Sequence, residues 1–444
     1  MLRYRLGLIG CLLLMIIPIT AQESDRPLPT LYTTHAQTSG NRLIDGAGTF
    51  PDVTRIDRPT TITAPQFLIA VPDVHEDDAQ FMLSGDDQMQ IFSLNDTSNL
   101  QAIDHAFVDA LPRPVFAVTR RTDHTYDLLF NTRPTWTDFR PAAHTHLFPL
   151  PAADNGDDRY LAIADNGDLV YTRVPASGTR LENRRALMIQ PDARIVQSRQ
   201  GLFAVYTRAT DQRYVHGIMG DRLEGAGLVV FAVNDDDLQI ITQINLPGDA
   251  VYEGLSPLWA DIDDDGRDDL VTTISQSRLG SRLRAYLLTD GGTTIEIDGP
   301  AIGQANRWQH QLAHAPFSPD GTPELVEVLT PHIGGVVRFY RFTGTCLAIV
   351  AQVRGYTSHV IGSRNLDLAV AGDFNGDGTP EIVLPAQRRD TIAGIQRTTN
   401  GAEVVWELPL GGTLATNLAA VRLESGLALA VATTDGHLRV WRSR

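Results

Sequence analysis

The chain has 444 residues, of which 43% are hydrophobic and 20% are charged, so it can bury a large core. Asp and Glu outnumber Lys and Arg by 53 to 37, and the formal net charge of −16 argues against broad contact with nucleic-acid phosphates or anionic lipid. No lysine is present, so all 37 cations are arginine. This excludes enzymes that need a lysine Schiff base or a phosphate-loop lysine.

The first 21 residues have the three parts of a secretory signal. Arg3 and Arg5 precede an apolar stretch at residues 6–17, and a Pro-Ile-Thr-Ala segment ends at Ala21. We expect cleavage after Ala21 and a secreted or extracytoplasmic protein. The alternative is an uncleaved N-terminal membrane anchor, although the apolar segment is shorter than the roughly 20 residues that span a bilayer.

The residues after this segment, 22–62, combine Pro, Ser, Thr, Gln and Gly without apolar periodicity, which predicts a flexible N-terminal arm. From residue 63 the sequence changes to short apolar runs separated by Gly, Asp and Asn clusters, with no sustained helical period. The body, residues 63–444, is therefore predicted to be all-β. With the signal removed, Cys346 is the single cysteine, so we expect no internal disulfide.

Apolar runs recur along the body, each usually followed by another strand-like segment after a polar turn. They lie at residues 81–83, 115–118, 160–163, 202–205, 269–271, 324–326, 381–383 and 427–430. Repeats of about 40 to 57 residues that hold about four short strands are typical of β-propeller blades. The length of the body favours seven four-stranded blades, whereas the number of runs favours eight.

The end of the chain predicts how the ring closes. The last blade has three strand-like segments before Arg444, so its outer strand is missing, and an exposed edge of this kind invites aggregation. We therefore predict that a segment within residues 45–72 pairs with the strand around Val440. Residues 22 to about 45 are predicted to be unstructured, because they cannot bury enough apolar surface to offset their chain entropy.

Two acidic loops carry the clearest chemical signal. Residues 261–270 and 373–382 both place oxygen-bearing side chains at positions 1, 3, 5 and 9 and glycine at position 6. Calcium takes six to eight oxygen ligands, and a tightly curled loop can aim alternate side chains and the position-7 carbonyl at one point. The predicted calcium ligands are Asp261, Asp263, Asp265, Arg267 and Asp269 in the first loop and Asp373, Asn375, Asp377, Thr379 and Glu381 in the second.

Two other interpretations of these loops were considered. A solvated turn would also be rich in Asp and Gly, but its crowded carboxylates would repel one another without a cation. A helix-loop-helix calcium hand is excluded, because position 12 is Thr272 or Leu384 where a bidentate Glu is needed. With their flanking strands, residues 258–271 and 370–383 resemble the FG-GAP or VCBS repeat of integrin-type β-propellers. This resemblance implies a calcium ion between the inner two strands of a blade, on one face of the propeller.

A third loop, residues 316–325, keeps the glycine and the acids at positions 5 and 9. It has Pro316 and Ser318 at positions 1 and 3, so we expect it to keep its shape without calcium. Acidic segments at 73–78 and 155–158 lie in similar places but lack the glycine. The resemblance is therefore clear only over residues 250–410.

Enzyme chemistry is the alternative class of function. The sequence segments around four histidines could meet in the centre of the ring and hold zinc or polarise a substrate: His310, His314, His332 and His359. No two of them have a metal-binding spacing, so the sequence favours single buried or exposed histidines. His144 and His146 are interpreted as surface residues. Residues 399–406 faintly resemble a blade motif of the pyrroloquinoline quinone dehydrogenases, but that family repeats the motif and this chain has one copy.

We therefore expect an exported, calcium-stabilised β-propeller that acts as a binding or scaffolding module. Its expected partner is a protein or a carbohydrate, and we expect no nucleic-acid partner. Membrane contact is expected only through an uncleaved N-terminal segment, and the protein is expected to be a monomer. The alternative is an extracytoplasmic hydrolase, lyase or dehydrogenase whose central pocket uses some of His310, His332, His359 and Arg364.

Overall fold

The computed structural model describes residues 39–444 except 74–76, 86–87, 96–100, 105–117, 121–125, 131–132, 137–141, 143–147, 151–156, 176–180, 290–291 and 293. The predicted signal segment, residues 22–38 of the predicted arm, and the histidines at 144 and 146 lie outside these residues. Within the described part, no helix is long and apolar enough to cross a membrane.

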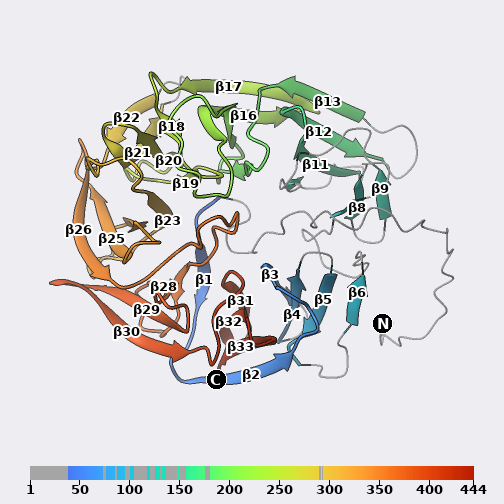
Figure 1. Cartoon of the computed structure of the whole chain (residues 1–444), viewed down its shortest axis with the longest axis vertical. Coiled ribbons are helices and arrows are strands. Elements are labelled where there is room, and N and C mark those ends of the chain that lie inside the picture. Colours follow the sequence, from blue (N-terminus) through green and yellow to red (C-terminus); the bar gives the residue numbers. More distant parts are fainter. Residues whose placement is uncertain are drawn as a thin grey trace.

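The described strands form a ring of small sheets around a common centre (Figure 1). There are six separate sheets and one nine-stranded sheet, in which the short strand β18 (Val251–Tyr252) pairs with two neighbouring blades. The nine-stranded sheet therefore contains two blades, and the ring of described strands has eight. The length-based expectation of seven blades is wrong, and the alternative of eight, which followed from the number of apolar runs, is correct.

The first four blades lie between residues 67 and 245. Their strands, in chain order, are β3 (Phe67–Asp73), β4 (Asp78–Ser84), β5 (Gln88–Ser93) and β6 (Gln101–Asp104); β7 (Val118–Arg120), β8 (Tyr126–Phe130) and β9 (Arg133–Trp136); β10 (Phe148–Leu150), β11 (Asp158–Ile163), β12 (Asp168–Val174) and β13 (Leu181–Ala186); and β14 (Val196–Gln197), β15 (Phe203–Thr210), β16 (Glu224–Asn234) and β17 (Asp237–Asn245).

The last four blades complete the ring. Their strands are β19 (Leu258–Ala260), β20 (Asp269–Gln276), β21 (Gly280–Leu288) and β22 (Thr294–Asp298) in blade five; β23 (Gln309–Ala315), β24 (Glu324–Leu329), β25 (Val336–Phe342) and β26 (Leu347–Arg354) in blade six; β27 (Val370–Asp373), β28 (Glu381–Pro385), β29 (Thr391–Thr398) and β30 (Gly401–Pro409) in blade seven; and β31 (Ala419–Leu423), β32 (Gly426–Thr433) and β33 (His437–Ser443) in blade eight.

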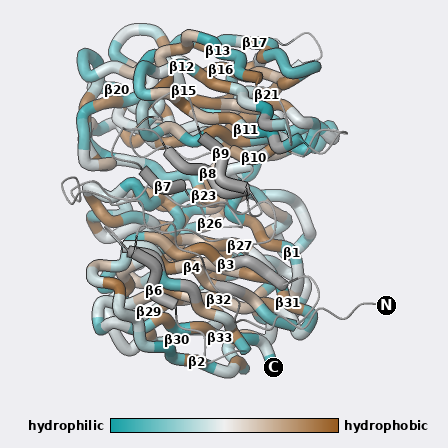
Figure 2. The backbone as a smooth tube through the Cα atoms, turned by 90° about the vertical axis from the view of Figure 1, so that its right-hand side faces the viewer, coloured by the Kyte–Doolittle hydropathy of each residue, from teal (hydrophilic) through white to brown (hydrophobic). Residues whose placement is uncertain are grey.

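The apolar runs of the sequence belong mainly to the second strand of each blade. In β24, β28 and β32, nearly every residue is buried, because both faces of these strands pack against neighbouring blades. The outer strands β26 and β30 alternate between buried and exposed residues. Figure 2 shows the resulting distribution, with hydrophobic stretches within the stacked strands and hydrophilic ones at the turns.

Neighbouring blades are held together by large apolar side chains. Between blades six and seven, four fully buried residues share one cluster: Phe317, Phe339, Ile382 and Ile395. Burying a side chain of this size contributes roughly 1.5–3 kcal/mol relative to leaving it exposed. The ring is therefore stabilised blade by blade through such contacts.

The predicted closure of the ring is confirmed. Strand β2 (Val53–Pro59) pairs antiparallel with β33 and supplies the missing outer strand of blade eight. Its register places Val53 opposite Ser443, Ile56 opposite Val440 and Pro59 opposite His437. An N-terminal segment thus completes the last blade.

The prediction that residues 22–62 form a flexible arm is wrong for residues 39–62. Besides β2, residues 43–47 form strand β1 (Leu43–Ala47), which pairs in parallel with β27 on the inner side of blade seven (Figure 1). Local composition marks neither strand, because their partners lie more than 300 residues away in the sequence, and β2 was predictable only from the missing outer strand of blade eight.

This closure predicts the effect of N-terminal truncation. A chain without residues 1–60 should have a lower thermal unfolding temperature and aggregate more, because β33 loses its outer partner β2 and each lost hydrogen bond costs roughly 0.5–1.5 kcal/mol. The matched control removes only residues 1–38 and keeps β1 and β2. Differential scanning calorimetry and light scattering measure both effects, and equal unfolding temperatures for the two truncated chains would contradict the assigned role of β2.

Candidate functional site

The acidic loops lie at one place in their blades, between the first and second strands. Loop one (Asp261–Asp269) connects β19 to β20, and loop two (Asp373–Glu381) connects β27 to β28. Loop three (Pro316–Glu324) connects β23 to β24 in the blade between them. The three loops therefore follow equivalent strands of blades five, seven and six, as the repeat pattern predicted.

Loop one brings three carboxylates together. One carboxylate oxygen each from Asp261, Asp263 and Asp265 can be chosen so that all three lie within 4.8 Å of one another. Asp261 accepts hydrogen bonds from the backbone N–H groups of Asp265 at 3.1 Å and Gly266 at 2.9 Å, which curls the loop around it. Burial, followed by the charges of Asp265 and Asp261, raises the pKa of Asp263. The Arg267 guanidinium Nε donates to Asp265 at 3.0 Å and offsets part of this charge.

Loop two has the same backbone arrangement with one carboxylate fewer. Asp373 accepts a hydrogen bond from the N–H of Gly378 at 3.0 Å, and Asp377 accepts one from the N–H of Thr379 at 2.9 Å. The side-chain oxygen of Asn375 accepts the N–H of Asp377 at 2.9 Å. The side chains at positions 1, 3 and 5 thus wrap around one short turn, as they do in loop one.

The position-9 acids differ from the other predicted ligands in their surroundings. Asp269 accepts the N–H of Ile262 at 3.0 Å, and Glu381 accepts the N–H of Phe374 at 2.8 Å and the indole N–H of Trp406 at 3.4 Å. Burial raises the pKa of both Asp269 and Glu381 to about 7. Each of these acids ties the second residue of its loop to the next strand, so its main visible role is to anchor the loop.

Loop three contains an internal cation. The Arg341 guanidinium Nη2 donates to Ser318 Oγ at 2.7 Å and to Glu324 Oε1 at 2.9 Å, and it lies 3.8 Å from Asp320. Arg397 Nε donates to the other oxygen of Glu324 at 2.8 Å. The protein itself therefore supplies the positive charge in the loop that lacks acids at positions 1 and 3.

A second cluster lies at the opposite ends of the same strands. His332 and His359 share a 2.7 Å hydrogen bond between ring nitrogens, and His310 Nδ1 is 2.9 Å from Ser358 Oγ. The Trp308 ring stacks on His310 with centroids 4.6 Å apart. The interpretation of these histidines as separate residues is wrong, because three of the four meet in one cluster. His314 lies at the far end of β23, where its backbone pairs with the side chain of Asn41.

The three clustered imidazole rings are uncharged at neutral pH. Burial lowers the pKa of His332 to about 4 and that of His359 to about 3, and it lowers the pKa of His310 strongly. His310 is 2% exposed, and its Nε2 has no hydrogen-bond partner among the described residues. Neutral rings of this kind can accept hydrogen bonds but do not attract anions.

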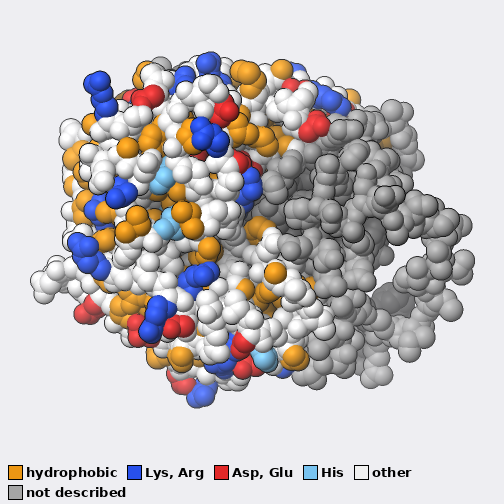
Figure 3. Space-filling view, in the orientation of Figure 1, with side chains coloured by type: hydrophobic (Ala, Val, Ile, Leu, Met, Phe, Trp, Pro, Cys, Tyr) orange, Lys and Arg blue, Asp and Glu red, His pale blue; other side chains and the backbone are white. Residues whose placement is uncertain are grey.

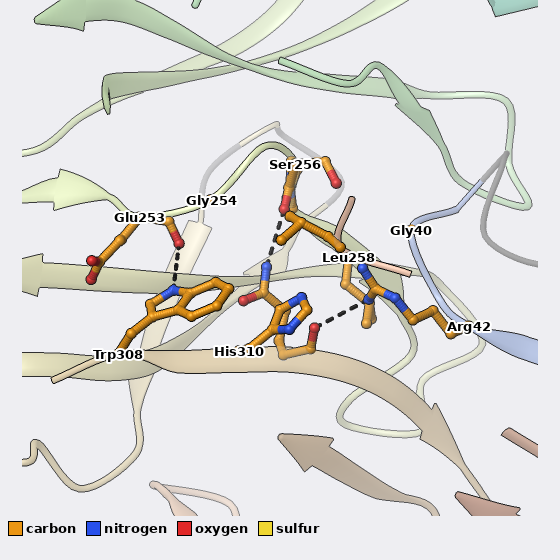
Figure 4. Close-up of a pocket in the computed structure, with 11 residues that line it drawn as sticks. Gly40, Arg42, Glu253, Gly254, Ser256, Leu258, Trp308 and His310 are labelled. Atoms are coloured by element: carbon orange, nitrogen blue, oxygen red, sulfur yellow. Dashed lines mark hydrogen bonds between the residues drawn. The ribbon is translucent and has the colours of Figure 1, made fainter. Parts of the chain in front are cut away.

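A narrow pocket borders this cluster (Figure 4). Its polar lining includes Glu253, Ser256, His310, Gln311 and Arg42 of the N-terminal segment. The cavity of about 10 Å³ has room for about one water molecule, so it is far smaller than the roughly 300 to 1,000 Å³ of typical small-molecule sites. His332, His359 and Arg364 do not line it, so the pocket collects only part of the predicted enzyme residues.

Several charged groups of this region are paired with one another, and Asp192, Glu224 and Glu253 among them are buried. Arg364 bridges Asp192 at 2.9 Å and Asp221 at 2.5 Å, and Glu253 is 2.6 Å from Nδ1 of His216. Glu224 is 2% exposed. Burial, followed by the charges of Glu253 and Asp192, raises its pKa well above the ordinary value of 4.5. The predicted candidate Arg364 is therefore engaged by protein carboxylates.

Sequence reasoning missed several members of this cluster. Arg42, His216, Glu224 and Glu253 are single polar residues without a motif, and the first lies in the segment that was interpreted as an arm. Arg42 precedes β1, His216 lies between β15 and β16, Glu224 begins β16 and Glu253 follows β18, so only the fold brings them together. On the face shown in Figure 3, acidic and basic side chains of the described part are interspersed and form no extended patch of one sign.

The buried acid Glu224 predicts a pH-dependent stability. Its folded-state pKa lies above the unfolded value, so its contribution to stability is fully present below about pH 4 and is lost as the pH rises through the folded-state pKa. As the pH rises from 5 to 9, the unmodified protein should lose this contribution, whereas Glu224→Gln has no ionising group to lose it. The urea midpoint of Glu224→Gln should therefore increase relative to that of the unmodified protein over this pH range. Exposed Glu424→Gln is the control, and a pH-independent difference between E224Q and the unmodified protein would show that Glu224 is ionised in the fold.

No protein-family model matches the sequence, and no curated protein matches it. Among solved structures, quinohemoprotein alcohol dehydrogenase from Comamonas testosteroni aligns with a TM-score of 0.50 and 11% identity over 94% of this chain and 78% of that chain. BBS1N in complex with ARL6DN gives 0.41 and 11% over 90% and 98%, and a chain of the Mitotic Checkpoint Complex gives 0.40 and 12% over 89% and 95%. At these identities the similarity concerns the fold alone. The described strands and the first of these similarities identify the chain as an all-β protein with a β-propeller fold.

Proposed function

We propose that this chain is an exported β-propeller of the FG-GAP or VCBS type, which is stabilised by calcium and acts as a binding or scaffolding module for a protein or a glycan. The observation that carries the calcium assignment is the group of three carboxylates in loop one, with ligand atoms within 4.8 Å of one another. Like charges at this separation raise one another's pKa unless a cation lies among them.

The donor set fits calcium in chemistry and in layout. Asp261, Asp263 and Asp265 offer carboxylate oxygens, and Arg267 offers its carbonyl at position 7. Hard oxygen donors in a flexible loop suit calcium, whereas magnesium demands a smaller octahedral cage and holds its water. Loop two offers the equivalent donors of Asp373, Asn375, Asp377 and Thr379. The ion would neutralise the loops and fix their turns, and it has no reaction to perform there.

Loop three supports this proposal by contrast. Arg341 lies among the side chains at positions 3, 5 and 9 of that loop. Loops one and two keep the equivalent turn without an arginine that bridges positions 3, 5 and 9, although at loop one Arg267 pairs with Asp265 and Arg199 lies 3.5 Å from Asp261. A positive charge at the centre of the turn is thus supplied by the protein in one loop, and we infer that calcium supplies it in the other two.

The arrangement of the central cluster supports a binding module rather than an enzyme. The groups that an enzyme would use are engaged with one another: Arg364 with two aspartates, and His359 with His332 and the carbonyl of Ser363. The pocket beside them also contains Arg42 of the N-terminal segment. The alternative of a hydrolase, lyase or dehydrogenase is therefore less well supported than a binding role.

Calcium should raise the stability of the unmodified protein. Binding confined to the folded state adds RT ln(1 + [L]/Kd), which is roughly 2.7 kcal/mol per site at a hundredfold excess over Kd. The thermal unfolding temperature should therefore rise with calcium, fall with chelator and respond weakly to magnesium. Scanning calorimetry with the three additions measures this, and identical curves in calcium and chelator would show that the acidic loops are only turns.

Matched variants assign the effect to the loops. Asp265→Ala and Asp377→Ala change position 5 of loops one and two, and each should remove about half of the calcium-dependent shift. Asp320→Ala changes position 5 of loop three, beside Arg341, and should leave the shift unchanged. A shift that is equally reduced in all three variants would contradict site-specific binding.

A further inference from the structure

The N-terminal segment runs along the first strands of blades five, six and seven, on the inner side of the ring (Figure 1). The backbone N–H of Trp259 donates to the Ser39 carbonyl at 2.9 Å, close to the pocket at the start of β19. The Arg42 N–H donates to the Leu312 carbonyl at 3.2 Å, and the Ala371 N–H donates to the Arg42 carbonyl at 2.6 Å. The segment therefore contacts the first strands of three successive blades before it reaches the loop face.

At the loop face this segment lies directly against loop two. The Gly48 N–H donates to the Asp373 carbonyl at 2.8 Å, and the Phe50 N–H donates to the Phe374 carbonyl at 2.8 Å. A Cβ atom added at Gly48 would lie 2.3 Å from the Phe374 carbonyl oxygen, and one at Gly376 would lie 2.5 Å from the Gly48 carbonyl oxygen. Loop two and residues 48–50 thus fit each other without space for a methyl group on either side.

Aromatic contacts extend this fit to the anchor of the loop. The Phe50 ring lies 5.3 Å from that of Phe374 and 5.2 Å from that of Trp406, centroid to centroid. Trp406 donates its indole N–H to Glu381, the position-9 acid of loop two. Phe50 is 2% exposed and belongs to the cluster between blades seven and eight. The first and the last residue of loop two are both connected to the N-terminal segment.

The chain continues from this contact into the closure strand. Val53, three residues after Phe50, begins β2, which pairs with β33. Among the described residues, loop one has no such hydrogen bond to the N-terminal segment. Outside the loop, Leu288 of its own blade donates its backbone N–H to Asp269, and the other partners come from blade four, with Arg199 bonded to Asp268 at 2.7 Å and Gln200 to the Gly266 carbonyl at 3.2 Å. Loop two therefore lies against the segment that leads into the closure strand β2, whereas loop one lies against blade four.

We propose that calcium in loop two and closure of the ring are coupled, so that the ion in this loop locks the N-terminal segment onto blade seven and the segment in turn strengthens calcium binding. The proposal rests on the calcium function proposed above. If calcium orders loop two, the N-terminal segment loses less conformational entropy when it binds there, and the same holds for calcium when the segment is already bound. Such coupling between two binding events is reciprocal. Couplings of this kind change affinity by roughly 5- to 150-fold.

The first experiment follows the segment while the ion is varied. Amide hydrogen exchange of peptides covering residues 43–59 is compared in calcium and in chelator for the unmodified protein, Asp377→Ala and Asp265→Ala. Calcium should slow exchange of these peptides at least fivefold in the unmodified protein and in D265A, and it should have no such effect in D377A. Equal protection in all three proteins, or protection that depends on loop one, would overturn the proposal.

The second experiment follows the ion while the segment is varied. Gly48→Ala introduces the steric conflict with Phe374, and isothermal titration with calcium is carried out in the D265A background, where loop two is the remaining site. Gly48→Ala should weaken this binding at least fivefold. The same substitution in the D377A background reports loop one and should leave its affinity unchanged. Gly299→Ala, whose added Cβ meets no atom closer than 3.6 Å, is the control substitution.

The outcomes separate the two proposals. If the unmodified protein binds no calcium, the proposed function fails and the coupling fails with it. If calcium binds loop two with the same affinity in the presence and absence of Gly48→Ala, the coupling alone is overturned. Should Gly48→Ala not fold, Phe50→Leu keeps the backbone, removes the ring contacts and must show the same selective loss at loop two.

Discussion

The antiparallel pairing between β2 and β33 is the constraint on which the rest of the molecule depends. Seven residue pairs, from Val53 with Ser443 to Pro59 with His437, join the two ends of the described chain. Without these pairs blade eight has three strands and an open edge, and no strand of the N-terminal segment is paired with the last blade. Residues 39–50 lead to β2 along the first strands of blades five, six and seven, on the inner side of the ring. The buried position of Arg42 is a direct result of this path.

Buried ion pairs between arginine and aspartate lie in the interior of the ring. Arg42 and Arg194 both lie beside Asp367, at 3.2 and 2.9 Å, and all three side chains are nearly inaccessible. A buried ion pair contributes little net stability but is costly to break, because the remaining charge is left uncompensated. In a chain without lysine, the planar guanidinium group serves each of these positions, and its several N–H donors let Arg341 contact two residues of loop three with one nitrogen.

The sequence predicted the features that depend on nearby residues. Asp261 to Asp269 form their turn within nine positions, so spacing alone located loop one, and the same holds for loop two. The runs in β24, β28 and β32 were visible because strands buried on both faces are continuously apolar. The missing outer strand was also predictable, since an unpaired β33 would be an exposed edge. The blade number was ambiguous because the first two apolar runs are only 35 residues apart.

Features that join distant residues could not be predicted in this way. Arg42 and Asp367 are separated by 325 positions, and no local pattern marks either of them. His310 and Ser358 are brought together by two neighbouring blades, although each reads as an ordinary polar residue in its own segment. The central cluster exists only because the ring is closed, whereas the acidic loops are determined by their own sequence. This difference separates what a single sequence reveals about the molecule from what its fold adds.

The composition of β2 has a consequence for how the molecule folds. This strand is among the first parts of the described chain to be synthesised, yet its partner β33 is among the last, and contacts between such distant segments form slowly because the loop to be closed is long. During that time β2 is a single strand that could pair with other chains. Its sequence, Val-Thr-Arg-Ile-Asp-Arg-Pro, carries three charges and ends in a proline, which are the features that protect an unpaired strand from aggregation. The charges and the proline of β2 thus keep the strand soluble until blade eight is made.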